Sequence, residues 1–217
     1  MGEDILGMAV RYRALIQNSH VRLRSGRHTA TFFDARRILC NPMLLKEFAS
    51  EIIYLIKNRW MYFHVVVGRP PDCIKFATAV AIVLTNLSMS AVDLISSEER
   101  KGDIKQPKVE FSPFYAGQIR GREVILIEDV AMTLATLKEM ARAIREAGGN
   151  LLGGVVVCNR AGDIEEELGV PFLSLINVSE DENWQSWPQE ECPLCAKGVP
   201  LEWKVDDEKG FLVPATR

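Results

Sequence analysis

The fold is decided by the stretch Glu123-Val124-Ile125-Leu126-Ile127, which two acidic residues, Glu128 and Asp129, follow directly. An uninterrupted apolar run of this length is typical of a parallel strand that is buried on both faces of a sheet. Between Leu134 and Ile144, apolar residues then recur every three or four positions, as they do along one face of a helix. The sequence therefore predicts a buried strand, a short polar turn and an amphipathic helix.

The same alternation of strand and helix extends to both sides of this stretch. Further strands are expected at 63–67, 91–95 and 154–158, and further helices at 3–18, 42–59 and 72–87. Such an alternation predicts an α/β fold with an open, mainly parallel sheet and helices on both faces. Because these sheets bind ligands beyond the carboxyl ends of their strands, the site is expected in the loops that start at Gly68, Ser96, Glu128 and Asn159.

Composition sets the domain organisation and excludes several classes of protein. The 217 residues are 47% hydrophobic and 25% charged, as in an ordinary globular chain. We expect a single domain with a core at about 42–178 and a hood formed by 1–41 and 179–217, the polar stretch after Ser179 being a lobe rather than more sheet. The net charge of −3 gives no general attraction for nucleic acid or membranes, so a phosphate site must be local. Without an apolar segment of about 20 residues or a secretory signal, a cytoplasmic protein is expected.

Polar groups that suit a phosphorylated sugar follow the central strand. The carboxylates of Glu128 and Asp129 can hold sugar hydroxyls or a hydrated cation. The helix after them offers N–H groups and the positive end of its dipole to a phosphate, and Thr133 and Thr136 can donate further hydrogen bonds. In the alternative interpretation, the acidic pair is a solvated strand end and Thr133 is a helix N-cap. The spacing alone leaves both open.

Five stretches occur together in the order that they have in one known family. They are residues 22–34 with Ser25-Gly26-Arg27 and Phe32-Phe33, residues 117–122, the acidic pair with its turn at 128–136, Cys158-Asn159-Arg160, and the tail 192–201. In this order the chain resembles the type I phosphoribosyltransferases, and among them the orotate phosphoribosyltransferases. The resemblance implies transfer of phosphoribose from phosphoribosyl diphosphate to orotate, in pyrimidine nucleotide synthesis, with Mg²⁺ as cofactor. It also implies a homodimer that acts on small molecules.

The resemblance implies a role for each matching residue. Glu128 and Asp129 would hold the ribose hydroxyls, and Lys101 and Lys105 would join them as catalytic residues by neutralising the leaving diphosphate. Further contacts to the donor would come from Thr133, Leu134, Ala135, Thr136, Arg69 and Arg100. The orotate base would be held by Arg24, Phe32, Phe33 and Arg160. As alternatives, Arg160 is a surface charge and the Phe32-Phe33 pair is half core.

Two stretches depart from the family at its phosphate-binding loops. Leu134 and Ala135 stand where the family has glycines, which approach a phosphate closely and adopt positive φ without strain. Pro70 and Pro71 remove two N–H donors from the loop that should donate them. These departures favour a second hypothesis, a non-catalytic relative that binds a nucleotide or base as a sensor or scaffold.

The tail contains Cys192-Pro193-Leu194-Cys195, which has the spacing of half a zinc site. No second cysteine pair follows, and His20, His28 and His64 are distant in the sequence. A zinc ion held within one chain is therefore not expected. A zinc ion shared between two subunits and a reversible disulfide stay open, and we expect the tail to pack against the core.

Overall fold

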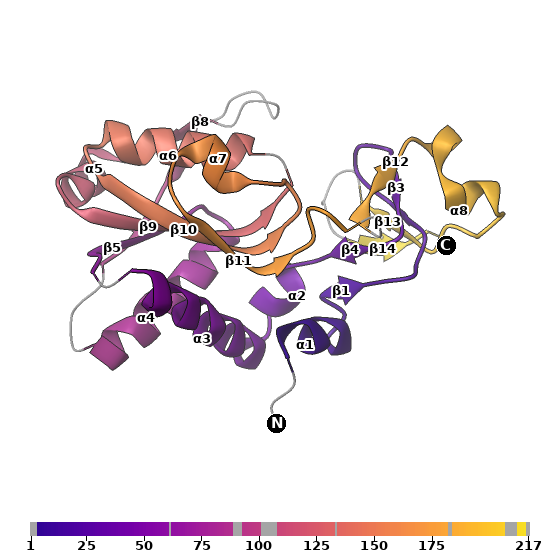
Figure 1. Ribbon diagram of the computed structural model, residues 1–217, viewed down its shortest axis with the longest axis horizontal. Helices are drawn as coiled ribbons and strands as arrows, with labels where there is room; N and C mark the ends of the chain where they lie inside the picture. The colour runs from indigo at the N-terminus through magenta and orange to yellow at the C-terminus, as the bar shows by residue number, and fades with distance from the viewer. Residues whose placement is uncertain are drawn as a thin grey trace. The chain divides into compact units, whose positions relative to one another are not determined.

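The structure is a computed structural model that describes residues 4–60, 62–88, 93–100, 108–132, 134–181, 184–206 and 212–215 (Figure 1). It divides into two compact units. The small unit combines Met1–Ile38 with Val178–Arg217, and the large unit is Leu39–Asn177. Among the described residues, no helix combines the length and the apolarity that a membrane crossing requires.

The large unit is built on a five-stranded sheet in which every neighbouring pair of strands is parallel, in the order β11-β10-β9-β5-β6. These strands are β5 (Val65–Gly68), β6 (Asp93–Ser96), β9 (Glu123–Ala131), β10 (Asn150–Asn159) and β11 (Phe172–Asn177). In Figure 1, α6 and α7 lie on one side of the sheet and α3 and α4 on the other. The helices are α3 (Pro42–Arg59), α4 (Cys73–Ser88), α5 (Pro113–Ile119), α6 (Ala135–Glu146) and α7 (Ile164–Leu168), and α2 (Arg36–Leu39) precedes them. The predicted fold class is confirmed.

Local sequence signals explain the central elements of this unit. Four consecutive apolar residues of β9, at 124–127, are fully buried, as expected for a strand with helices on both sides. The side chain of Asn41 accepts hydrogen bonds from the N–H groups of Met43 and Leu44, so it caps α3 as the sequence predicts. The apolar face of α6 is buried in the main core, which includes Leu137, Met140 and Ile144.

Three predicted elements differ from those observed. The first helix, α1 (Ile5–Arg11), ends well before residue 18, because Arg13 adopts a φ of 57° that no helix allows. Leu15 then enters β1 (Leu15–Ile16), which pairs with β4 (Phe32–Phe33). The strand expected to end at Ile127 continues to Ala131, because β10 pairs with it over the same length.

The charged stretch after Ser96, expected to be a loop, contains two short strands. These strands, β7 (Glu98–Arg100) and β8 (Lys108–Glu110), are paired antiparallel, with Arg100 opposite Lys108. Apolar periodicity does not detect them, because each strand is only three residues long and Val109 of β8 is the one residue among them that the structure describes as buried.

The small unit has a sheet of its own, in the order β12-β3-β2-β13-β14. Its strands are β2 (Val21–Arg22), β3 (His28–Thr29), β12 (Ser186–Trp187), β13 (Trp203–Val205) and β14 (Leu212–Pro214). The stretch after Ser179 forms a lobe outside the sheet of the large unit, as expected. It is not irregular, however, because its residues find strand partners in the N-terminal segment: β12 pairs with β3, and β13 with β2. Two short elements connect them, η2 (Gln189–Glu191) and α8 (Pro193–Ala196).

Candidate active site

The candidate site of the large unit lies at the carboxyl ends of β5, β9 and β10. Gly68 at the end of β5 is opposite Ile127, so the acidic pair is the next step along the central strand. On the other side, Glu128 is opposite Val156, and Ala131 is opposite Asn159. Three strand ends thus bring together the loops in which the sequence predicts a site.

Glu128 is buried together with a thiol that the sequence analysis did not identify as a site residue. Glu128 and Cys73 expose only 2% and 1% of their surfaces. The Cys73 thiol donates to Oε1 of Glu128 at 2.6 Å and lies 3.3 Å from Oδ1 of Asp129. Among the described residues, the other carboxyl oxygen of Glu128, Oε2, is buried and has no hydrogen-bond partner. A buried polar group without a partner is unusual and indicates a place where a ligand can contribute one.

Burial and the neighbouring charge of Asp129 raise the pKa of Glu128 to about 8. The carboxyl group of Glu128 is therefore mostly protonated at neutral pH. Burial and the two carboxyl groups also raise the pKa of the Cys73 thiol well above its usual range, so the thiol remains a hydrogen-bond donor and is not a thiolate nucleophile. Asp129 is only half-buried and accepts a hydrogen bond from the N–H of Val130 at 2.7 Å.

The loop after β5 is positioned by a close contact between strand and helix. A Cβ at Gly68 would lie 2.7 Å from Cβ of Ala77 and 2.8 Å from the carbonyl oxygen of Cys73, so only glycine fits. This contact sets the first turn of α4, which carries Cys73, against the acidic pair. The charge of Arg69, in the same loop, favours ionisation of Glu128.

The turn before α6 is the stretch in which the sequence predicts a phosphate site. Leu134 occupies the N-cap position without a side-chain cap, and its side chain packs against the main core. The N–H groups of the first turn, which starts with Ala135 and Thr136, have no acceptor within the helix, and the helix dipole favours an anion beside them. Thr133, the N-cap in the alternative interpretation, lies outside the described residues.

Arg160 follows directly from the end of β10. Its N–H donates to the carbonyl of Ala131 at 2.8 Å, which ties it to the central strand. The residue is half-buried, and burial lowers the pKa of its guanidinium group. Asn159, where the family has aspartate, accepts from the N–H of Ala161 and donates to the carbonyl of Gly162, both at 2.9 Å, so it shapes the turn.

The remaining predicted site residues belong to the small unit, to β7 or to stretches outside the described residues, so their roles stay predictions. Arg24 is exposed in the turn between β2 and β3 of the small unit. Phe32 packs against the core of that unit, and Phe33 is buried and paired with Leu15. Arg100 ends β7, and its side chain lies outside what the structure describes. Lys101, Lys105 and Thr133 also lie outside the described residues.

Comparison with known proteins identifies the family. A family model described as the phosphoribosyl transferase domain matches residues 37–193. The chain belongs to this family. Within this family, the chain is close to the orotate phosphoribosyltransferases, as the order of its motifs predicts.

Two curated relatives cover nearly the whole chain. The orotate phosphoribosyltransferase of Caldanaerobacter subterraneus subsp. tengcongensis is 28% identical over 188 residues, which are 86% of this chain and 88% of the relative. An orotate phosphoribosyltransferase of Thermus thermophilus is 27% identical over 199 residues, 92% of this chain and 98% of the relative. The crystal structure of the Mycobacterium tuberculosis H37Rv orotate phosphoribosyltransferase in complex with Fe(III) dicitrate has the same fold, with a TM-score of 0.61 at 22% identity over 82% of this chain and 98% of that chain.

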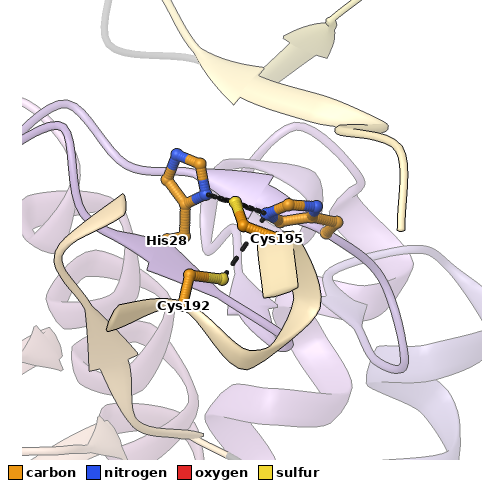
Figure 2. Close-up of side chains that lie close together, drawn as sticks. His28, Cys192 and Cys195 are labelled. Carbon is orange, nitrogen blue, oxygen red and sulfur yellow. Dashed lines mark hydrogen bonds between the residues drawn. The ribbon is translucent and has the colours of Figure 1, made fainter. Parts of the chain in front are cut away.

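Two features of this phosphoribosyltransferase were not predicted from the sequence: the thiol beside the acidic pair, and the histidines beside Cys192 and Cys195. Cys73 follows the Gly68 loop, and its place at the start of a helix that faces the acidic pair was the available signal. His20 and His28 were set aside because they are far in sequence from Cys192 and Cys195, yet the small unit brings all four together. Figure 2 shows the side chains of His28, Cys192 and Cys195 turned toward one another. The reason for setting aside a metal site within one chain is therefore wrong.

Proposed function

We propose that this phosphoribosyltransferase transfers phosphoribose from phosphoribosyl diphosphate to orotate, giving orotidine monophosphate and diphosphate. The observation that supports this most is the acidic pair on the central strand, with the uncapped N-terminus of α6 a few residues later. One part suits ribose hydroxyls and the other a phosphate. The curated relatives with this name, which match nearly the whole chain, support the same reaction.

Each group has a distinct task in the proposed reaction. Asp129 accepts hydrogen bonds from the ribose hydroxyls, and the buried carboxyl group of the adjacent Glu128 helps to fix its position. The N–H groups at Ala135 and Thr136 hold the 5-phosphate. The guanidinium of Arg160 is suited to the carboxylate of orotate, since arginine can pair with a carboxylate through two parallel hydrogen bonds.

Mg²⁺ fits the oxygen atoms at this site better than it fits the thiol beside them. Magnesium prefers hard oxygen ligands, which Asp129 offers, whereas the sulfur of Cys73 suits softer metals. We propose that Asp129 holds the ion together with the donor. When bound, Mg²⁺ neutralises charge that develops on the leaving diphosphate. We also propose a cytoplasmic homodimer as the working form.

Binding without turnover is the second candidate function, and two observations favour it. The Cys73 thiol already occupies one oxygen of Glu128, and Leu134 is part of the core where the family has a flexible glycine. A site of this kind can retain a nucleotide or base while it lacks the donors that stabilise a departing diphosphate.

The test compares turnover with binding in the full chain. Loss of orotate absorbance is followed with phosphoribosyl diphosphate and Mg²⁺, and donor binding is measured by calorimetry. Asp129→Asn is expected to lower kcat/KM by about 10²–10³-fold, the usual cost of one electrostatic contact to the transition state. The exposed Glu47→Gln variant on α3 is the matched control and should leave turnover unchanged.

Three outcomes separate the candidates. Turnover of orotate that depends on Asp129 supports the transferase. Donor binding without turnover of orotate, uracil or a purine base supports the binding function. No heat at millimolar donor contradicts the transferase.

A further inference from the structure

Four potential metal ligands meet inside the small unit, far from the acidic pair along the chain. They are His20 and His28 from the N-terminal hairpin, and Cys192 and Cys195 from the segment around α8. One ligand atom from each residue lies within 4.8 Å of all the others. Neither cysteine is in a disulfide. All four residues belong to the same compact unit.

The distances between the ligand atoms fit a tetrahedral zinc centre. With Zn–N of about 2.0–2.1 Å and Zn–S of about 2.3 Å, nitrogen and sulfur ligands should lie about 3.6 Å apart. Nε2 of His20 lies 3.7 Å from Sγ of Cys192 and 3.6 Å from Sγ of Cys195, and Nδ1 of His28 lies 3.3 Å from Sγ of Cys195. The two nitrogens are 2.8 Å apart, a hydrogen-bond distance that must open by about half an ångström when both bind metal.

A contact behind the cluster orients one of the histidines. Nδ1 of His20 lies 2.8 Å from the carbonyl oxygen of Val199, so the ring donates its proton there and directs Nε2 at the sulfurs. Metal-bound histidines usually have such a second hydrogen bond, which fixes the tautomer and the orientation of the ring.

Backbone geometry also places the ligands without strain on the surrounding elements. Cys192 is the N-cap of α8 and Cys195 lies one turn later, which puts both sulfurs on the same side of the helix start. On the other half, His28 starts β3 and is paired with Arg22 of β2, so the hairpin fixes its position beside His20.

The cluster is buried in a unit that has little apolar core. His20, His28 and Cys192 expose 2%, 4% and 1% of their surfaces. The buried apolar cluster at the sheet of this unit is small and consists of Val21, Leu23, Val205 and Leu212. Units with so small a core commonly gain their stability from a metal or a disulfide. The contacts of the cluster join residues 167, 172 and 175 positions apart in the sequence, and a cross-link that closes so long a loop restricts the unfolded chain strongly.

We propose that His20, His28, Cys192 and Cys195 bind one structural zinc ion that joins the N-terminal hairpin to α8 within the small unit. Two imidazoles and two thiolates in a closed tetrahedral set are typical of a structural zinc site and leave no open position for a substrate. The ion therefore stabilises the small unit and takes no part in phosphoribosyl transfer.

The first experiment measures metal in the untagged full chain. After gel filtration without chelator, mass spectrometry of the elements is expected to find about one zinc per chain. In the double variant Cys192→Ser/Cys195→Ser, the zinc content per chain should fall about tenfold or more. The same fall is expected for His28→Ala. Cys40→Ser, an exposed cysteine, and His64→Gln, a histidine of the large unit, are the matched controls and should retain the zinc.

A second experiment does not depend on whether the variants fold. Replacing zinc by Co²⁺ in the unmodified chain should give the intense visible absorption of tetrahedral cobalt with thiolate ligands. No zinc together with no such absorption overturns the proposal, as does a Cys192–Cys195 disulfide found by alkylation before reduction. A ratio of one zinc to two chains overturns it in favour of a shared ion, and zinc retained by the double variant overturns it as well.

Discussion

Replacing Glu128 with glutamine should make the chain more stable at neutral and alkaline pH. The carboxyl group of Glu128 is buried, and its pKa is raised from 4.5 to about 8 by burial first and by the charge of Asp129 second. Glutamine has nearly the same shape as the protonated carboxyl group but cannot ionise. The variant therefore removes the cost of a buried charge and keeps the packing.

The pKa shift gives the sign and the size of this effect. Because the folded pKa is above the unfolded one, the folded chain retains a proton between pH 4.5 and about 8 that the unfolded chain has released. The contribution of Glu128 to stability is thus complete below pH 4.5 and is lost as the pH rises through 8. A difference of one in pKa corresponds to about 1.4 kcal/mol, so the total loss is on the order of 4 kcal/mol, part of it shared with Asp129.

Urea unfolding at several pH values between 5 and 9 tests this prediction. Circular dichroism in the far ultraviolet follows the large unit, because the long helices α3, α4 and α6 belong to it. Glu128→Gln should match the unmodified chain near pH 5 and exceed its free energy of unfolding by a few kcal/mol near pH 8. The exposed Glu47→Gln variant should follow the unmodified chain throughout. If the difference in free energy of unfolding between Glu128→Gln and the unmodified chain were the same at every pH, a raised pKa of Glu128 would be refuted.

Three further substitutions test the elements that position the site, each by the urea midpoint. Gly68→Ala should lower the free energy of unfolding by about 1–3 kcal/mol, since its Cβ would lie 2.7 Å from that of Ala77. A Cβ at Gly117 in α5 meets no atom within 4 Å, so Gly117→Ala should be neutral or stabilising by up to about 1 kcal/mol. Asn41→Ala removes the cap of α3 and should cost about 1 kcal/mol. Asn159→Ala leaves two backbone groups of the turn before Arg160 without their partner and should cost about 1–3 kcal/mol, and an unchanged midpoint would show that the turn does not need this side chain.

The large unit could be predicted from sequence because its signals are local. Val124–Ile127 and the stripe on α6 are each visible within one element, and the strand ends then bring Gly68 and Glu128 to the same edge of the sheet. The extension of β9 to Ala131 could not be predicted, because two acidic residues interrupt the apolar run while the pairing with β10 continues. The change from apolar to polar residues therefore shows where the buried part of a strand ends, whereas the strand itself ends where its hydrogen bonds to the neighbouring strand end.

The sheet of the small unit could not be predicted, because its order comes from pairing between the two ends of the chain. Its strands are two or three residues long and carry no periodicity of their own. His28 and Cys195 are separated by 167 positions, yet their ligand atoms lie 3.3 Å apart. Spacing rules for zinc sites search within a short segment, so they recognise Cys192 and Cys195 as half a site and cannot supply the other half.

The departures from the family motif take part in packing, which explains how the fold tolerates them. Leu134 packs in the main core, and Cys73 donates to the otherwise costly buried carboxyl group of Glu128. These contacts stabilise the folded conformation of the site even when no donor is bound. The Cys73 contact is made to Oε1 of Glu128, whereas Oε2, which has no partner among the described residues, is the oxygen left for the donor. Cys73→Ala should then leave donor binding intact or strengthen it, while the free energy of unfolding falls by about 1–3 kcal/mol, the usual cost of a buried polar group that loses its partner.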